Sequence, residues 1–241
     1  MANPRFYEIA DLSEGSEITL SDSCFQHAIK VLRLKEGAAI TLFNGNGHDY
    51  SATLTQVSKK SAQARIDQSE PRPTESAIHS HIGQVMSRGE RMDYAVQKST
   101  EMGVNQITPL TSERCEVRLN AERQTKRINH WQQIAISACE QSGRSKVPKI
   151  EPCTPLEAWI SEQNADLKLV LHHHCAKKLG EFTPPASVAL LIGPEGGLTE
   201  REVELARQHG FQAVAFGPRV MRTETAPVAA LSILNYLWGD Q

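Results

Sequence analysis

The sequence predicts an α/β protein in which a small β-rich domain precedes a larger α/β domain with a largely parallel sheet. Three observations lead to this prediction. Apolar and polar residues alternate with a period of two through much of the first 70 residues. A polar segment with two prolines follows at residues 69–76, and beyond it strand patterns alternate with helical patterns. We therefore expect domains at residues 1–70 and 76–241.

The first domain is predicted to consist of strands and one helix. "NGNG", from Asn44 to Gly47, predicts a hairpin between two of the strands. The segment after Leu20 has the pattern of a short amphipathic helix, with Ser21 or Ser23 as a possible N-cap and Gly37 beyond its end. We expect this helix to close a small β-barrel. The predicted strands lie at residues 16–20, 38–44, 48–57 and 61–67.

The second domain alternates strands and helices in regular succession. Thr199, with Glu202 three residues later, has the pattern of a capping box at a helix start. In a parallel sheet of this kind, ligands bind at the carboxyl ends of the strands, so we expect the site there. The predicted strands lie at residues 78–85, 105–110, 149–153, 167–173, 188–193 and 213–217. The predicted helices lie at residues 88–103, 120–143 and 155–163, from Thr199 onward, and at residues 223–237.

Composition describes an ordinary globular protein of 241 residues with a formal net charge of −2, which gives no global attraction to nucleic acid. The longest apolar run is far shorter than the ~20 residues that a membrane helix needs. The N-terminal residues show no basic stretch followed by an apolar core, so we expect a cytoplasmic protein. The 5 cysteines form no C-x-x-C pair, which favours reduced thiols over disulfides or a zinc knuckle.

The turn in "LLIGPEGGLTERE" is the first candidate binding feature. It follows an apolar strand and runs from Gly193 to Gly197. The turn has neither the lysine of a P-loop nor the glycine spacing of a dinucleotide turn. Glu195 would repel a phosphate, but it suits a ligand with hydroxyls, an amine or a positive centre. The alternative is an ordinary strand–helix turn in which Glu195 complements the helix dipole.

A second Gly-Pro turn occurs in "FGPRVMRTETAPVAAL". The strand before it ends at Phe216, and Pro227 falls in the first turn of the next helix, where its missing N–H costs least. Two such turns can enclose one pocket. Backbone groups together with apolar side chains suit a flat heterocycle, and the candidate side chains are Ile192, Phe216, Val220 and Met221.

A histidine run, His172 to His174, followed by Cys175, ends the strand before the glycine-rich turn. Adjacent residues on a strand point to opposite faces, so at most two of these side chains could share one metal ion. We expect no metal, and a metal-dependent hydrolase built on this run is the weaker alternative. His79 and His81 share a strand face, which favours a polar face or a supporting role.

Several segments together resemble one family. "GQVMSRGERMDYAVQKSTEMGV", "LLIGPEGGLTERE" and "GPRVMRTETA", with "HAIKVLR" and "FNGNG" nearer the N-terminus, resemble the RsmE family of ribosomal RNA methyltransferases in the SPOUT superfamily. The resemblance implies a PUA-like β-barrel and an α/β domain whose C-terminal segment forms a trefoil knot. Such a knot is an exception to the rule that protein chains are not knotted. It also implies a homodimer that binds S-adenosylmethionine and methylates N3 of a uridine in 16S RNA of the small ribosomal subunit. The positive sulfonium and amino groups of this cofactor explain why a glutamate is tolerable in the turn.

The resemblance also guides the choice of site residues. Uridine N3 carries a proton, so the enzyme must help to remove it or stabilise the resulting anion. We expect Arg222 first and Arg219 second to stabilise the anion, with Glu224 as orienting partner or proton acceptor. A structural ion pair between Arg222 and Glu224 is the alternative. The expected cofactor contacts are Leu171, His172, Ile192, Gly193, Glu195, Gly197, Phe216, Gly217, Val220, Met221 and Thr225.

RNA binding is expected to involve both domains, because a small barrel can position the backbone while a base is turned out of its helix. The candidates are Arg5 and Arg33 in the first domain and Arg88 and Arg91 in the second. The main alternative function is a non-catalytic RNA-binding ribosome assembly factor on the same fold. Both Gly-Pro turns speak against it, because binding RNA alone does not require a small-molecule pocket.

Overall fold

A computed structural model of the protein describes residues 3–172 and 179–240. The chain separates into two compact units. The first unit comprises Met1–Glu75 and Ile136–Val147, and the second comprises Ser76–Ala135 and Pro148–Gln241. The segment Ile136–Val147 was not expected in the first unit, because its sequence continues the pattern of a helix that begins in the second.

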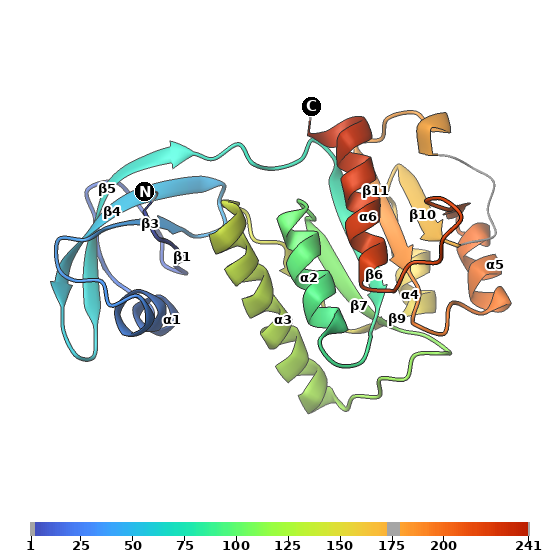
Figure 1. Cartoon of the computed structure of the whole chain (residues 1–241), viewed down its shortest axis with the longest axis horizontal. Coiled ribbons are helices and arrows are strands. Elements are labelled where there is room, and N and C mark those ends of the chain that lie inside the picture. Colours follow the sequence, from blue (N-terminus) through green and yellow to red (C-terminus); the bar gives the residue numbers. More distant parts are fainter. Residues whose placement is uncertain (1–2, 173–178, 241) are drawn as a thin grey trace. The chain divides into compact units, whose positions relative to one another are not determined.

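The first unit contains a five-stranded sheet in the order β1-β3-β4-β5-β2 (Figure 1). β1 pairs with β3 in parallel, and the other pairings are antiparallel. The predicted hairpin is confirmed, because β3 and β4 pair around a turn in which Gly45 and Gly47 have φ angles of 93° and 90°. Side chains such as Phe6, Ile40 and Leu42 form the core. The strands are β1 (Arg5–Tyr7), β2 (Glu17–Thr19), β3 (Ala39–Phe43), β4 (His48–Val57) and β5 (Ala62–Pro71).

The short helix predicted in the first domain is present. α1 (Asp22–Phe25) begins at the N-cap Ser21, whose hydroxyl accepts the backbone N–H of Cys24 at 3.4 Å. It continues as a π-helical segment, η1 (Gln26–Val31). The helix stops there, and Arg33 adopts a left-handed backbone conformation with φ of 55°. The helix therefore ends before Gly37, the residue expected beyond its end.

The second unit contains a parallel sheet in the order β12-β10-β11-β6-β7-β8, with β9 also paired to β7. All its pairings are parallel, which confirms the predicted arrangement. The strand predicted at residues 149–153 is interrupted because Pro152 has no N–H to donate, which leaves the two short strands β8 and β9. The strands are β6 (His79–Val85), β7 (Gln106–Thr111), β8 (Lys149–Ile150), β9 (Thr154–Pro155), β10 (Leu167–Leu171), β11 (Ser187–Ile192) and β12 (Gln212–Val214).

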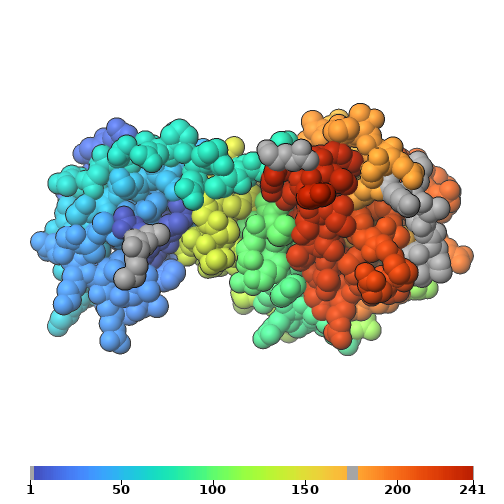
Figure 2. Space-filling model, turned by 45° about the horizontal axis from the view of Figure 1, so that its top comes forward, coloured from blue at the N-terminus to red at the C-terminus, as the bar shows by residue number. Residues whose placement is uncertain are grey.

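Helices cover both faces of this sheet. On β6, His81 and Gly83 face Trp159 of α4, whereas Gln84 on the opposite strand face reaches Thr223, just before α6. α2 lies beside α6, and α4 lies beside α5 (Figure 1). In Figure 2 the red surface of α6 lies against the green surface of α2. The helices are α2 (Arg91–Glu101), α3 (Ala121–Ser142), α4 (Leu156–Glu162), η2 (Leu179–Glu181), α5 (Glu200–Gln208), α6 (Thr225–Leu234) and η3 (Asn235–Gly239).

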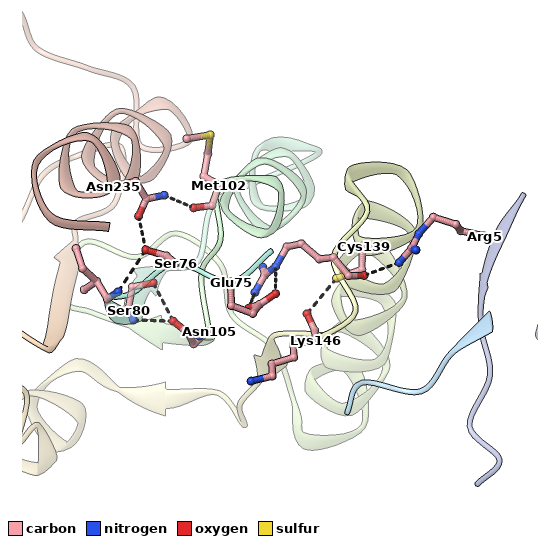
Figure 3. Close-up of polar contacts among 11 residues, drawn as sticks. Arg5, Glu75, Ser76, Ser80, Met102, Asn105, Cys139, Lys146 and Asn235 are labelled. Carbon is pink, nitrogen blue, oxygen red and sulfur yellow. Dashed lines mark hydrogen bonds and ion pairs between the residues drawn. The ribbon is translucent and has the colours of Figure 1, made fainter. Parts of the chain in front are cut away.

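Polar contacts fix the two ends of the second unit to each other. The Asn235 side chain donates a hydrogen bond of 2.7 Å to the carbonyl of Met102 and accepts one of 3.1 Å from the Ser76 hydroxyl (Figure 3). In the first unit, the buried guanidinium of Arg144 pairs with both carboxylate oxygens of Glu75. Within the described residues, no helix combines the length and apolar character required to cross a bilayer.

Candidate active site

Three neighbouring strands end at one cavity. β12, β10 and β11 are adjacent and parallel, so their carboxyl ends lie at the same sheet edge. The cavity there has a volume of about 700 Å³, and all its lining residues belong to the second unit. The residues predicted from the sequence that line it are Arg91, Leu171, His172, Ile192, Gly193, Glu195, Gly197, Phe216, Gly217, Arg219, Val220, Met221, Arg222 and Glu224.

The glycine-rich turn forms one wall. A Cβ at Gly193 would lie 3.0 Å from Cγ of Leu198, and Gly197 has φ of 71°, so neither position accommodates a larger residue easily. The predicted capping box after the turn is confirmed. The Thr199 hydroxyl accepts the N–H of Glu202 at 3.2 Å, and Glu202 accepts the N–H of Thr199 at 2.8 Å.

Thr223 connects the two Gly-Pro turns, although the sequence analysis did not select it. Its hydroxyl donates to the carbonyl of Gly193 at 2.7 Å and accepts from Nε2 of Gln84 at 2.9 Å. Both Thr223 and Gln84 are buried. The segment before α6 is thereby tied to the end of β11, which keeps two cavity walls together. Thr225, an expected cofactor contact, is instead exposed at the first position of α6 and is not a lining residue.

Glu195 in the glycine-rich turn forms an ion pair with Arg91, with 2.8 Å between Oε1 and Nη1. Burial opposes ionisation of Glu195, but hydrogen bonds from its own backbone, Arg91 and the Arg88 backbone outweigh this effect and lower the pKa of the carboxyl. Arg91 was expected among the RNA contacts. It lines the cavity instead, where it is already paired with Glu195. The charge that Glu195 presents to a ligand is largely balanced by Arg91.

Arg219, Arg222 and Glu224 lie on the segment between β12 and α6. Both arginines are exposed, and within the described residues neither forms an ion pair. The structural ion pair between Arg222 and Glu224, considered as an alternative, is thus not formed in the structure. Oε2 of Glu224 is buried without a hydrogen-bond partner among the described residues. A buried carboxylate oxygen with this environment is costly, which favours a role in binding or proton transfer.

Apolar side chains complete the walls. Ile192 is fully buried at the base, and Phe216 and Met221 are half-buried. Val220 also lines the cavity and is 79% exposed. His172 is held in place by its backbone N–H, which donates to the carbonyl of Val214 at 3.1 Å. The cavity therefore combines apolar surface with backbone polar groups.

Arg114 was also missed by the sequence analysis. It lies in the loop after β7, lines the cavity, and donates from Nη1 to the carbonyl of Gly196 at 3.0 Å. One signal could have found it, because β7 is parallel to the other strands and its carboxyl end lies at the same sheet edge. The sequence analysis had considered only the last three strand ends.

The remaining expected RNA contacts have different environments. In the first unit, the Arg5 side chain is 15% exposed, is paired with Asp49, and donates to the carbonyl of Arg144 at 3.2 Å. Arg33 is exposed beside the end of η1. In the second unit, Arg88 is exposed and paired with Glu116 at 3.1 Å. Arg5 thus has a structural role, whereas Arg33 and Arg88 present their charges to solvent.

The described residues contain no group of three or more His, Cys, Asp or Glu side chains that could hold a metal ion. The histidine run lies partly outside the described residues, because His173, His174 and Cys175 fall in the segment 173–178. His81 belongs to a buried cluster, since its Nε2 accepts the Trp159 indole N–H at 3.2 Å.

Comparison with known proteins agrees with these features. The family described as RNA methyltransferase domain matches residues 74–235, and the family described as RNA methyltransferase PUA domain matches residues 20–67. A protein named ribosomal RNA small subunit methyltransferase E from Buchnera aphidicola is 34% identical over 98% of this chain and 94% of its own length.

Two solved structures are similar along nearly the whole chain. One, described as a putative methyltransferase from Legionella pneumophila in complex with the bound cofactor SAM, has a TM-score of 0.97 and 39% identity and covers 100% of both chains. The other, a ribosomal RNA small subunit methyltransferase E from Neisseria gonorrhoeae bound to S-adenosyl methionine, has a TM-score of 0.94 and 41% identity and covers 99% of both chains. The family expected from the sequence motifs is therefore confirmed: the chain belongs to the ribosomal RNA small subunit methyltransferase E family.

Proposed function

We propose that the protein transfers the methyl group of S-adenosylmethionine to N3 of a uridine in 16S RNA of the small ribosomal subunit. Membership of the family and the cofactor-bound relatives support the reaction class. One observation of the chain itself carries the proposal furthest. Two arginines without ion pairs among the described residues line the same cavity as Glu224, whose Oε2 is buried and has no hydrogen-bond partner among the described residues.

The residues present fit this cofactor. A volume of about 700 Å³ lies within the ~300–1,000 Å³ typical of small-molecule sites. The half-buried Phe216 and Met221 offer apolar surface to a flat heterocycle, and Gly193 and Gly197 let the backbone approach it closely. The unpartnered Oε2 of Glu224 leaves one acceptor for a cationic or N–H group.

We assign the holding of the cofactor to the residues predicted from the sequence. Bound S-adenosylmethionine supplies an electrophilic methyl group on a sulfonium that is a good leaving group. These residues orient it and exclude water, and Thr225 would act only through its position at the start of α6. They are Leu171, His172, Ile192, Gly193, Glu195, Gly197, Phe216, Gly217, Val220, Met221 and Thr225.

Proton removal from uridine N3 is assigned to Glu224. Glu224 lines the cavity, and its buried Oε2 has no competing hydrogen bond among the described residues, so we assign to this carboxylate the proton of a base placed in the cavity. Arg222 first, and Arg219 second, stabilise the negative charge that spreads onto the flanking carbonyl oxygens. Their guanidinium groups stay charged and are not neutralised by an ion pair with another described residue.

The first unit is proposed to bind rRNA as a PUA-like β-barrel domain. Arg33 on this unit and Arg88 on the second offer exposed positive charge for the RNA backbone. Arg5 contributes indirectly, because its contacts with Asp49 and Ser145 hold the first unit together. We propose the domain limits 1–70 and 76–241, with Ile136–Val147 as part of the first unit's packing.

Three further properties are proposed on the family resemblance. The second unit is a SPOUT domain whose C-terminal segment forms a trefoil knot. The protein is a homodimer, which the exposed side chains of Tyr94 on α2 and Tyr236 on η3 support, at 46% and 79% exposed. It acts in the cytoplasm, where its rRNA substrate is found and where buried free thiols such as Cys24 and Cys139 stay reduced.

The proposed reaction is tested by methyl incorporation from labelled S-adenosylmethionine into small ribosomal subunits that lack the modification. Mass spectrometry of the digested RNA should identify N3-methyluridine. A sharp decrease with Arg222→Ala, while cofactor binding persists, would support the assigned roles. Subunit binding without any methyl incorporation would instead favour a non-catalytic ribosome assembly factor, and a stoichiometric metal in the purified protein would revive the hydrolase alternative.

A further inference from the structure

The loop after β7 is fixed on both sides of Arg114. The N–H of Glu113 donates to Oε1 of Glu202 at 2.9 Å, and Glu202 is the buried acidic residue of the capping box at α5. On the other side, the buried Cys115 donates from Sγ to the carbonyl of Met86 at 3.5 Å. The backbone of Arg114 is therefore held between two buried anchors, although the residue itself is exposed.

The Arg114 side chain extends along the glycine-rich turn at the cavity. Its Nη1 donates to the carbonyl of Gly196 at 3.0 Å, and its Cβ would lie 3.6 Å from a Cβ added at Gly196. A guanidinium has five N–H donors in a rigid fork, and the contact with Gly196 uses one of them. The remaining donors are available at the rim of the cavity, in a direction limited by the anchored backbone.

The charge around the cavity is not explained by the cofactor alone. Among the described residues, four arginines line it, against two glutamates, and one of the glutamates is already paired with Arg91. A sulfonium cofactor is itself positively charged, so excess positive lining charge disfavours its binding. A polyanion at the cavity mouth removes this conflict, because arginine binds phosphate with several donors at once.

We propose that Arg114 binds a backbone phosphate of the rRNA strand beside the target uridine, and that it acts as a positioning residue. The inference rests on the proposed function. Phosphate is favoured over a base because Arg114 lies on the loop after β7, whereas Arg219, Arg222 and Glu224 lie on the segment assigned to the base. The bond to Gly196 also links RNA binding to the turn that holds the cofactor.

A purely structural role would differ in measurable ways. If Arg114 only held the turn through the carbonyl of Gly196, a neutral N–H donor at this position would be sufficient. Any loss caused by a substitution would then appear in the affinity for the cofactor and not in the affinity for the ribosomal subunit. Arg114→Gln keeps an N–H donor and removes the charge, whereas Arg114→Lys keeps the charge and loses the planar fork. The two variants therefore separate a phosphate contact from a brace.

The experiment measures binding of small ribosomal subunits lacking the modification to the full-length protein between 50 and 200 mM salt. Calorimetric titration with S-adenosylmethionine is run on the same preparations. Arg207→Gln is the matched control, because Arg207 lies on α5, is exposed and does not line the cavity. Binding is used as the readout so that catalysis does not enter the comparison.

We expect Arg114→Gln to bind subunits about tenfold more weakly or worse, with the slope of log affinity against log salt reduced by about 0.7–0.9. Arg114→Lys should retain the slope, and cofactor affinity should change little in either variant. An unchanged slope in Arg114→Gln, or a loss confined to cofactor affinity, would overturn the inference. Failure of the wild-type protein to bind subunits would instead overturn the proposed function and this inference with it.

Discussion

Thr223 donates a hydrogen bond of 2.7 Å from its hydroxyl to the carbonyl oxygen of Gly193. We expect Thr223→Val to keep the shape of the side chain but to separate the two Gly-Pro turns, because Gly193 then loses this donor. The expected cost is about 1–3 kcal/mol in the free energy of unfolding, together with weaker cofactor binding. Urea unfolding and calorimetry measure the two effects. Thr223→Ser retains the hydroxyl and should behave like the wild type; an equal loss in both variants would contradict this account.

Replacement of Glu224 by glutamine should separate catalysis from stability. Oε2 of Glu224 is buried without a partner among the described residues, so the neutral amide removes a poorly solvated charge. We expect the single-turnover rate of methyl transfer to fall by about 10²–10⁴ in Glu224→Gln, as for loss of a general base. The midpoint of thermal unfolding should stay the same or rise. A wild-type rate in this variant would exclude Glu224 as the proton acceptor.

Arg222 should affect the reaction without affecting the fold. It is exposed, and it forms no ion pair with any described residue, so Arg222→Ala removes little native-state interaction. We expect the single-turnover rate at saturating cofactor to fall by about 10²–10³. Arg201→Ala, which breaks an exposed ion pair with Glu157 elsewhere on the second unit, is the matched control. Equal rates for these two variants would show that Arg222 does not stabilise the reacting base.

His81 should make stability depend on pH. Burial lowers its pKa to about 4, with Glu151 opposing the shift and His79 adding to it. An unfolded chain binds the proton near pH 6.5, so between pH 6.5 and 4 the unfolded state carries a proton that the folded state lacks. The stabilisation is complete above pH 6.5 and decreases by about 1.4 kcal/mol per pH unit as the pH falls toward 4.

The measurement is urea unfolding of wild type and His81→Gln at pH 7 and pH 5. Glutamine keeps an acceptor for the Trp159 indole N–H but does not titrate. The wild type should therefore lose more stability than the variant over this interval. Identical losses would show that His81 is protonated in the folded protein at pH 5.

Because α4 lies close to the sheet, we expect replacement of Gly83 by a larger residue to destabilise the protein. A Cβ at this position would lie 2.7 Å from Cη2 of Trp159, whose side chain is buried and cannot move away. We expect Gly83→Ala to cost about 1–3 kcal/mol by overpacking. The cost should shrink in a Trp159→Leu background, which a double-mutant cycle measures. Gly180→Ala, where the added Cβ meets no atom within 4 Å, should be neutral.

The parallel sheet and most of its helices could be predicted because their patterns are local. Apolar runs such as residues 188–192 and the capping box at Thr199 are readable without knowledge of distant contacts. The strand at Arg5–Tyr7 could not be predicted, because three residues give too little periodicity and their parallel pairing with β3 is set by the fold. The π-helical segment that ends the first helix could not be predicted either, because it does not follow the α-helical period.

The cavity residues also divide into those that local sequence patterns predict and those that depend on tertiary contacts. The strand-end argument identified two Gly-Pro turns and Arg219, Arg222 and Glu224, all of which line it. It did not identify Arg114, which reaches the cavity from a loop more than 80 residues away from Gly196 in the sequence. Nor did it show that Arg91 pairs with Glu195, because side-chain direction depends on the packing of α2.

The packing of Ile136–Val147 with the first unit affects the order in which the protein folds during synthesis. Glu140 accepts the N–H of Tyr7 at 3.0 Å, and Ser145 accepts from Arg5 at 3.1 Å, so the β1 region lacks these partners until both residues have left the ribosome. These partners lie 133 and 140 residues apart in the sequence, which take ~7–28 s to translate at ~5–20 residues per second. The N-terminal strands therefore complete their packing only after a segment in the middle of the following domain has been synthesised. We expect the two units to finish folding together rather than one after the other.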